Sequence, residues 1–564
     1  MPHRKSLLGL SLVIAMLCGG CSREHADHSA AKPAAAGPTT RDGHLSPLLS
    51  NLGKFSRKVS TSNADAQTYF TQGLTLVYGF NHAEAVRSFD EAARNDPKLG
   101  MAYWGKALAI GPNVNDNADE PEREQQAYQA AQQAVANRDG MSDVERALID
   151  AIAVRFSHPE GADREKRMNA YAEVMEEVYA RFSSDPDVSA LYAAAVMDTM
   201  PWNYYLQDGQ PKPQIAKAVT ALEKAIALAP DHPGAHHYYI HAVEASLDPD
   251  RAIASADKLG ALVPGAGHLV HMPSHIYIRV GRYSDGTEAN LKAIRADEDY
   301  ITQCRAQGIY PADYYPHNVH FLTATLSMEG RSKETLAAAR KVGAHHGHDM
   351  LDVPGFGLPH LLKSIPIFAL VRFGKWDEVL ALAEPDNSDF VRAIWHYGRG
   401  LALTAKGDTA GATKELIALR TAAAEPKLEA LTIFDVNHLS SLAAIAVDVL
   451  DGEIAAKQGD HGHAIASLRK AVAGEDALLY SEPPDWPIPP RHNLGAVLLE
   501  SGNAVEAEKV FREDLQRHRN NGWALVGLAK SLEVQGKSAE AQQIRAQFDK
   551  SWAKADIKIA AARL

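Results

Sequence analysis

Seven histidines between Pro233 and Phe321 fall on the same few positions of a recurring helical segment. Imidazole is the side chain that most often binds transition metals in proteins, and it suits copper, zinc, iron and nickel. Several imidazoles on one face of a helical scaffold can therefore hold a metal ion. The residues that carry this prediction are His237, His241, His268, His271, His275, His317 and His320.

The scaffold is visible as a repeat of 34 residues. Counted from Ala66, the first unit has Gly73 at position 8, Phe89 at position 24 and Pro97 at position 32. This pattern resembles the tetratricopeptide repeat (TPR), a helix–turn–helix unit of the same length. Units with this spacing begin at Ala66, Gly100, Pro233, Gly267, Pro316, Ile488 and Gly522.

Repeats of this kind bury their apolar faces only by stacking on their neighbours. We therefore expect an all-α fold, a right-handed solenoid of TPR-like helix pairs with one concave groove. Strand signals are nearly absent, and apolar residues recur at helical spacing. Residues 112–228 and 342–449 fit the repeat poorly, and we expect divergent repeats or plain helical hairpins there.

The seven histidines occupy positions 2, 5 or 9 of their units. These positions lie within about 60° of one another around a helix, so their side chains share one face. Glu244, at position 12, continues the stripe as a candidate ligand, whereas His236 falls at position 4, off the pattern. Pro273 introduces an alternative, because it can kink the helix or open it and leave His268 and His271 in extended chain.

Three classes of function fit this groove. The first is a metal site, in a metal-handling protein or in a metal-dependent oxidoreductase or hydrolase; copper is favoured because Met272 adjoins His271, and zinc and iron remain open. The second is a scaffold that binds peptide or protein partners of the cell envelope. The third is a small-anion site in which imidazoles and Arg279 hold a carboxylate or phosphate. Any single histidine is more often a lining or hydrogen-bonded core residue than a ligand.

Several other polar and aromatic residues are candidates for lining the groove. A simpler explanation for Asn113 is that it caps a loop. A simpler explanation for the aromatic candidates, such as Trp202, is that they pack between repeats. Glu482 and Arg491 flank a proline-rich insertion, and we expect them to form an ion pair. The candidates are Asn113, Trp202, Tyr238, Tyr277, Arg279, Glu482 and Arg491.

The segments around the histidines resemble a family. HHYYIHAVEA (236–245), PGAGHLVHMPSHIYIRVGRY (264–283) and YYPHNVHF (314–321) are similar to motifs of a widespread, largely uncharacterised bacterial group of TPR proteins. FNHAEAVRSF (80–89), AYWGKALAIGPNVN (102–115), MPWNYY (200–205) and SEPPDWPIPPR (481–491) extend the resemblance over most of the mature chain. The resemblance implies the solenoid fold and no established activity.

The N-terminus reads as a targeting segment. A basic stretch and an apolar run of residues 7–17 precede LCGG and Cys21, as in a bacterial lipoprotein signal. We expect residues 1–20 to be removed, Cys21 to carry lipid, and residues 21–62 to form a flexible tether. Ser22 favours the outer membrane, with the protein facing the periplasm. Cys18 departs from the usual leucine, so ordinary secretion remains an alternative.

The rest of the chain divides into predicted repeats over residues 63–449, with the histidine groove, and C-terminal repeats over 450–564. The formal net charge of −12 argues against nucleic-acid binding. With Cys18 removed and Cys21 carrying lipid, Cys304 is the only other cysteine, which argues against an intrachain disulfide and a zinc site of the cysteine type.

Overall fold

The computed structural model describes residues 40, 42–116, 120–158, 163–206, 209–306, 308–345 and 348–564. The predicted targeting segment, Cys21 and the first part of the predicted tether lie outside these residues. The chain forms two compact units. Unit 1 is Met1–Ile276 with Lys292–Pro311, and unit 2 is Tyr277–Leu291 with Ala312–Leu564.

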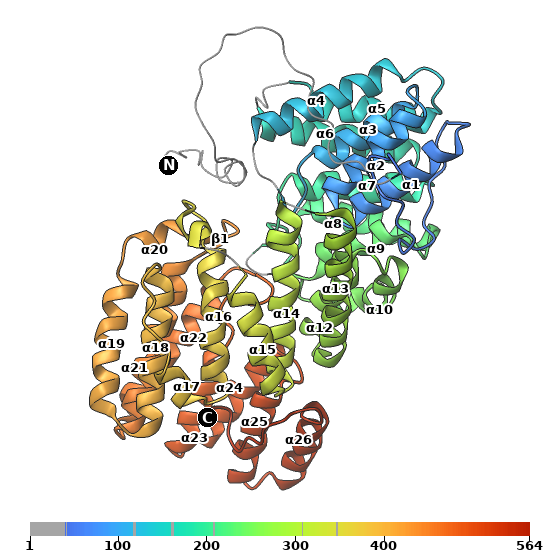
Figure 1. Ribbon diagram of the computed structural model, residues 1–564. Helices are drawn as coiled ribbons and strands as arrows, with labels where there is room; N and C mark the ends of the chain where they lie inside the picture. Colours follow the sequence, from blue (N-terminus) through green and yellow to red (C-terminus); the bar gives the residue numbers. More distant parts are fainter. Residues whose placement is uncertain are drawn as a thin grey trace, which may run out of the picture. The chain divides into compact units, whose positions relative to one another are not determined.

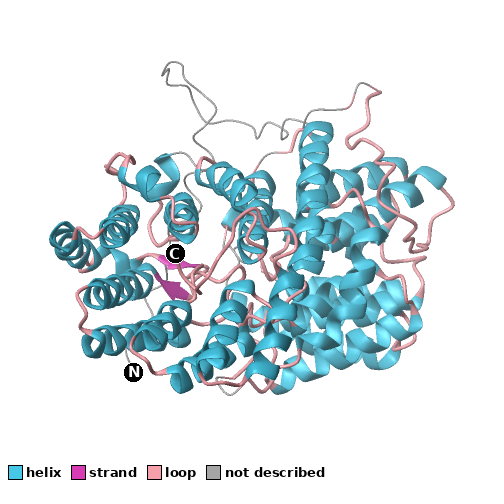
Figure 2. Ribbon diagram, turned by 90° about the horizontal axis from the view of Figure 1, so that it is seen from below, coloured by secondary structure: helices cyan, strands magenta, loops and turns pink. Residues whose placement is uncertain are grey.

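The described residues are helical almost throughout (Figure 1). Their only sheet is a two-stranded hairpin of β1 (Thr432–Ile433) and β2 (Asn437–His438), coloured magenta in Figure 2. The all-α prediction is therefore confirmed. No helix in this part of the chain combines the length and apolar character needed to cross a membrane.

Unit 1 is built from helices that pack on their neighbours in sequence. The predicted repeats at Gly100, Pro233 and Gly267 each coincide with the first residue of a helix. Helices α12 (Pro273–Arg279) and α13 (Tyr283–Cys304) cross the division between the units. The others are α1 (Ala64–Tyr78), α2 (His82–Asn95), α3 (Gly100–Ile110), α4 (Pro121–Ala136), α5 (Asp143–Arg155), α6 (Arg164–Arg181), α7 (Pro186–Asp198), α8 (Pro213–Leu228), α9 (Pro233–Val243), η2 (Pro249–Ala252), α10 (Ile253–Leu262) and α11 (Gly267–His271).

Unit 2 has the same construction, and consecutive helices again pack in pairs. A short π-helix, η3 (Tyr310–Tyr314), precedes its main run of helices. These are α14 (Tyr315–Met328), α15 (Ser332–Gly343), η4 (His348–Asp352), α16 (Leu358–Arg372), α17 (Trp376–Leu380), α18 (Asp389–Lys406), α19 (Thr409–Ala423), α20 (Lys427–Ala430), α21 (Leu439–Lys457), α22 (His461–Ala477), α23 (Pro490–Glu500), α24 (Ala504–Arg517), α25 (Gly522–Val534) and α26 (Ser538–Ser551).

The packing inside a repeat explains its glycine signature. A methyl group on Gly73 of α1 would lie 2.8 Å from the ring of Phe89 in α2. In unit 2, Gly495 of α23 meets the ring of Phe511 in α24 in the same way. At position 8 the two helices approach so closely that only a hydrogen fits beneath the aromatic ring. Because this close approach occurs in both units, we identify the pairs α1–α2 and α23–α24 as TPR-like.

Residues 42–62, the described part of the predicted tether, lie against unit 1. Ser46 donates a hydrogen bond to Glu84 at 2.5 Å, and Arg57 forms ion pairs with Asp185 at 2.9 Å and Asp187 at 2.8 Å. Both Ser46 and Arg57 are buried. This part of the chain is therefore held in place by the folded unit.

A candidate metal centre of histidines

Five of the predicted histidines come together inside unit 1, where they lie on the helices α9, α11 and α12. Helix α9 has Pro233 at its first turn, and the His232 ring at its N-cap accepts a hydrogen bond from Ala235 N–H at 3.0 Å. Its helical spacing places His237 and His241 one turn apart. Helix α1 packs on α9, and α11 and α12 supply the other three histidines.

Pro273 interrupts the second group of histidines without unfolding it. The proline has no N–H group and begins the short helix α12 directly after α11. Met272 between them keeps helical angles, φ −49° and ψ −35°, and its N–H donates to the His268 carbonyl at 2.9 Å. His268 and His271 are thus helical, and the alternative of extended chain is wrong.

The rings meet through their Nε2 atoms. The Nε2 atoms of His237 and His268 lie 3.0 Å apart, and those of His271 and His275 lie 2.9 Å apart. One ligating nitrogen from each of His237, His241 and His268 lies within 4.8 Å of the other two. All five side chains are buried. We call His237, His241, His268, His271 and His275 the histidine cluster.

Hydrogen bonds behind the rings orient them. The Nδ1 of His237 donates to the carbonyl of Tyr78 at 2.7 Å, and that of His241 donates to Glu244 at 2.8 Å. The Nδ1 of His275 donates to the other oxygen of Glu244. Because carbonyls and carboxylates only accept, these bonds place the proton on Nδ1 and leave the Nε2 lone pair directed away from the acceptor.

Glu244 was a candidate ligand on sequence grounds. In unit 1 both of its oxygens accept hydrogen bonds from the back of histidine rings, which is the usual position of a carboxylate that orients ligands. This arrangement favours an orienting role over direct ligation. His241 Nε2, by contrast, is buried and has no hydrogen-bond partner among the described residues. A lone pair left in that state is costly unless something else binds it.

Burial keeps the rings of His237, His241 and His268 neutral. Burial, with the neighbouring rings adding to it, holds the pKa of His237 and of His268 well below the usual 6.5. Burial also lowers the pKa of His241 and outweighs the opposite effect of Glu244. Burial alone would raise the pKa of Glu244, but the His275 and His241 rings next to it lower it. At neutral pH His237, His241 and His268 are therefore neutral, and Glu244 is a carboxylate.

Two aromatic residues cover the cluster from strained backbone positions. Phe80 has φ 56° and its ring centroid lies 4.6 Å from that of His237 and 5.1 Å from that of His268. Trp202 has φ 60° and meets the His241 ring edge-on at 5.2 Å. Left-handed backbone at bulky residues is rare, and such strain is concentrated at functional sites.

Sequence reasoning proposed Trp202 only as general groove lining and missed Phe80. The signal for Phe80 was available, because it opens the FNHAEAVRSF motif quoted for the family resemblance. Of the other predicted lining residues in unit 1, Tyr238 stacks on His237 with ring centroids 5.2 Å apart. Asn113 lines a small cavity of about 20 Å³ that Phe80 and Tyr238 also border.

His236 behaves as its off-pattern position predicts. Its Nδ1 is 2.9 Å from the hydroxyl of Ser255, and its Nε2 is 2.9 Å from the carbonyl of Pro230. Both ring nitrogens are therefore satisfied by ordinary hydrogen bonds. His236 adjoins His237 in the sequence but belongs to the packing of α9 on α10 rather than to the cluster.

His317 and His320 lie in α14 and belong to unit 2. His320 is buried, which lowers its pKa to about 4. The His317 ring centroid lies 5.1 Å from that of Phe321, in an edge-on contact. Their participation in a common metal site with the histidine cluster stays a prediction.

The remaining predicted lining residues are also in unit 2. Arg282 lies over the ring of Tyr277 at 4.4 Å, and Arg279 lies over that of Tyr480 at 5.2 Å. These are cation–π contacts that the sequence pattern does not reveal.

The proline-rich insertion is held differently from expectation. Glu482 is half-buried in the loop between α22 and α23. Arg491, expected to pair with it, forms ion pairs with Asp476 at 2.7 Å and Glu475 at 3.3 Å. Both acids belong to the last turn of α22, close to the start of α23, so the arginine ties the two helix ends together.

Comparisons with known proteins add no function. No family model matches the chain, and no curated protein matches it. Solved structures that resemble it include the human IFIT1 dimer with m7Gppp-AAAA, at 12% identity over 87% of this chain and 90% of that one, TM-score 0.29. Others are the APC/C hetero-tetramer Cut9–Hcn1, at 11% over 89% and 79%, TM-score 0.31, and yeast Tom70, at 14% over 87% and 92%, TM-score 0.27. Likenesses this distant carry no argument about what the chain binds.

Proposed function

We propose that this chain is a helical-repeat protein that binds a transition-metal ion through His237, His241 and His268 of unit 1. The observation that carries the proposal concerns His241, whose Nε2 is buried and has no hydrogen-bond partner in the described part of the chain, while its Nδ1 is fixed by Glu244. An imidazole oriented by a carboxylate, with its other nitrogen unused, is the usual form of a histidine ligand.

The spacing of the ring nitrogens supports the proposal. Two nitrogens each about 2.0–2.1 Å from one ion lie about 2.9–3.4 Å apart for bond angles between square and tetrahedral. The Nε2 atoms of His237 and His268 are 3.0 Å apart, so this pair needs little movement to accept an ion. His241 has to approach by a side-chain adjustment, because the three ligating atoms lie within 4.8 Å rather than within bonding geometry.

Ligand chemistry limits the metal. Neutral imidazoles without thiolates suit copper, zinc or iron, and among divalent ions an all-nitrogen site holds copper most tightly. We propose copper first, with zinc and iron as alternatives. The role supported by these contacts is binding. Glu244 is engaged by two rings, so it is not placed to act as a general base while those bonds persist.

The charge of the site argues against the small-anion alternative. An anion site needs protonated imidazoles, but burial lowers the pKa of His237, His241 and His268. The carboxylate of Glu244 adds a fixed negative charge that would repel a phosphate or carboxylate. A cation relieves this negative charge, whereas an anion increases it.

A TPR-like scaffold is also suited to binding a peptide or protein, and the metal site does not exclude that role. We propose, from the sequence, that the protein is anchored by lipid at Cys21 and faces the periplasm from the outer membrane. We also propose that it belongs to the largely uncharacterised bacterial group of TPR proteins, because its histidine motifs resemble those of that group. An envelope partner is consistent with this location.

The test compares metal binding by the wild type with metal binding by variants of two cluster histidines and of the neighbouring His236. Full-length protein is stripped with a chelator and titrated with Cu²⁺ and with Zn²⁺ in competition with a chromophoric chelator. We expect one tightly bound ion in the wild type, loss of that ion in His237→Ala and in His241→Ala, and full retention in His236→Ala. Circular dichroism checks that each variant is folded. Equal binding by all four proteins, or a wild type that takes up neither ion, would show that the cluster is not a metal site.

A further inference from the structure

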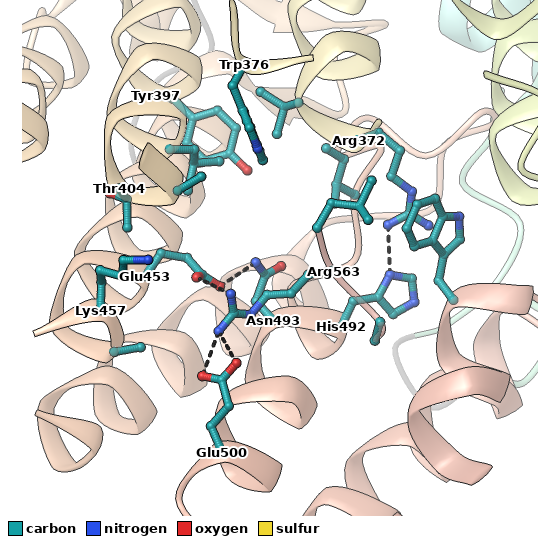
Figure 3. Close-up of a pocket in the computed structure, with 18 residues that line it drawn as sticks. Arg372, Trp376, Tyr397, Thr404, Glu453, Lys457, His492, Asn493, Glu500 and Arg563 are labelled. Carbon is teal, nitrogen blue, oxygen red and sulfur yellow. Dashed lines mark hydrogen bonds and ion pairs between the residues drawn. The ribbon is translucent and has the colours of Figure 1, made fainter. Parts of the chain in front are cut away.

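Unit 2 contains a cavity of about 260 Å³, remote in sequence from the histidine cluster and lined only by residues of this unit. Helices α16, α18, α21 and α23 contribute to its wall, together with residues 562–564 (Figure 3). The volume is close to the lower end of the range for small-molecule sites, roughly 300–1,000 Å³. It suits a small ligand rather than a folded segment.

On one side of the cavity two carboxylates share a single arginine as their cationic partner. Arg563 binds Glu453 at 3.0 Å and Glu500 at 2.8 Å, and Asn493 donates to Glu453 at 2.7 Å. Figure 3 shows these four side chains gathered at one side of the cavity. Because its carboxylates are engaged by donors, this side offers little attraction to a cationic ligand.

Arg372, on the opposite side, is a buried cation that no carboxylate of the described residues contacts. Its guanidinium lies 4.0 Å over the ring of Trp523, and its Nη1 donates to His492 Nδ1 at 3.0 Å. The His492 ring separates Arg372 from Asp514, because the Nε2 of His492 donates to Asp514 at 3.0 Å. Arg372 is 6% exposed. Burying a charge without a direct partner is unfavourable, because the charge loses its hydration.

The unused donors of Arg372 are the ones that recognise carboxylates. Its Nε and Nη2 make no hydrogen bond to any residue that the structure describes. These two groups form one edge of the guanidinium, the edge that holds a carboxylate with two parallel bonds. Burial lowers the pKa of Arg372 to about 9, which still leaves it protonated at neutral pH.

Further donors face the cavity. Figure 3 shows the indole nitrogen of Trp376 and the hydroxyl of Tyr397 pointing into it. Burial raises the pKa of Tyr397, so its hydroxyl stays protonated. Lys457 also lines the cavity and is exposed to solvent. Lys457, Trp376 and Tyr397 therefore add a cation and two hydrogen-bond donors to the wall, which the apolar side chains of Leu401, Val371 and Ile488 complete.

We propose that this cavity binds a small organic carboxylate with an apolar body. The carboxylate takes the side of Arg372, Tyr397 and Trp376, and the apolar body packs against Leu401, Val371 and Ile488. This site is separate from the metal centre and does not depend on it. A carboxylate supplies the charge that Arg372 lacks, whereas the corresponding neutral amide does not.

The test uses carboxylates paired with their amides as probes on the full-length protein. Benzoate and benzamide, and hexanoate and hexanamide, are titrated by calorimetry and by quenching of tryptophan fluorescence. We expect saturable binding of at least one carboxylate, about tenfold or more tighter than its amide, since a charge-assisted bidentate bond is lost in the amide. Arg372→Met should remove most of this preference and leave amide binding unchanged.

The matched control is Arg399→Met. Arg399 also lies over a tryptophan, Trp395 at 4.6 Å, but it is paired with Glu415 at 3.0 Å and does not line the cavity. This variant should bind the carboxylates as the wild type does. If Arg372→Met does not fold, Lys457→Met and Tyr397→Phe replace it, and each should weaken carboxylate binding about two- to fivefold. The proposal is overturned if no carboxylate binds, if carboxylates and amides bind equally, or if the variants bind like the wild type.

Discussion

The Nε2 atoms of His237 and His268 face each other at 3.0 Å inside unit 1. The Nδ1 of His237 donates to the Tyr78 carbonyl, so its Nε2 carries a lone pair and the Nε2 of a neutral His268 must supply the shared proton. When a metal ion binds between the rings, the proton of His268 moves to its Nδ1, and the Nε2 lone pairs of both rings then face the ion where the rings already stand. The pair is therefore satisfied in the metal-free protein and preorganised for the ion, which reduces the cost of binding.

Replacing Glu244 tests its role as an orienting group. In Glu244→Gln only one oxygen remains as an acceptor, so either His241 or His275 loses the bond to its Nδ1. We expect Cu²⁺ or Zn²⁺ affinity to fall by about 10- to 100-fold without loss of the site. Glu223→Gln is the control, because Glu223 pairs with Arg251 near the surface. Complete loss of metal in Glu244→Gln would instead identify Glu244 as a ligand.

The sequence predicts the positions of the cluster better than it predicts its surroundings. Positions 2, 5 and 9 place His237, His241 and His268 on one helical face, and the repeat length sets neighbouring helices side by side. The acceptor for His237, the Tyr78 carbonyl, lies 159 residues earlier in the chain. Contacts of that range follow from how α1 packs on α9, which no local pattern encodes.

The fold was predictable for similar reasons. Gly73 with Phe89 and Gly495 with Phe511 recur at fixed spacing because each pair meets in the same helix–helix contact. The strained turn at Phe80 has no such signature, since left-handed backbone at phenylalanine is imposed by tertiary packing. The cation–π contact of Arg279 with Tyr480 is likewise a product of packing between distant segments.

The pH dependence of metal binding follows from the lowered pKa values. His237, His241 and His268 have pKa values below 6.5, so they stay neutral as pH falls from 7.5 to about 6.5. We expect metal affinity to change less than about tenfold over that interval and to fall more steeply below it. Isothermal titration at each pH measures this. Phosphate affinity that rises as pH falls would indicate an anion site.

The same shifts affect the stability of the metal-free protein. In the unfolded chain these histidines take up protons near pH 6.5, whereas in the folded chain burial keeps them neutral to lower pH. The unfolded state therefore binds more protons below pH 6.5, and the free energy of unfolding should decrease as pH falls from about 6.5 to 5. Denaturant titrations at several pH values check this. His237→Ala should show a weaker dependence on pH than the wild type.

Phe80 provides a measure of backbone strain at the site. Phe80→Ala removes the ring and keeps a side chain at φ 56°, whereas Phe80→Gly removes the ring and the strain together. We expect the glycine variant to be more stable than the alanine variant by about 1 kcal/mol. Both should release metal to a chelator faster than the wild type, because the ring no longer covers His237. Equal stability of the two variants would show that the turn is unstrained.

The close approach within a repeat can be tested in unit 2. In Gly495→Ala the new methyl group overlaps the Phe511 ring, and we expect destabilisation of about 1–3 kcal/mol. Gly462→Ala in α22 is the control, because its methyl group meets nothing closer than 3.6 Å and alanine favours the helix. Thermal unfolding followed by circular dichroism should separate the two. A Gly495→Ala protein as stable as the control would contradict this packing.

The most direct measurement is anomalous diffraction from crystals of the full-length protein loaded with Cu²⁺ or Zn²⁺, recorded at the absorption edge of the ion. The account predicts an anomalous peak about 2.0–2.1 Å from the Nε2 atoms of His237, His241 and His268, with Glu244 behind His241. A peak elsewhere in a protein that has bound the ion in solution, with these three rings still hydrogen-bonded to one another or to the protein, would contradict it.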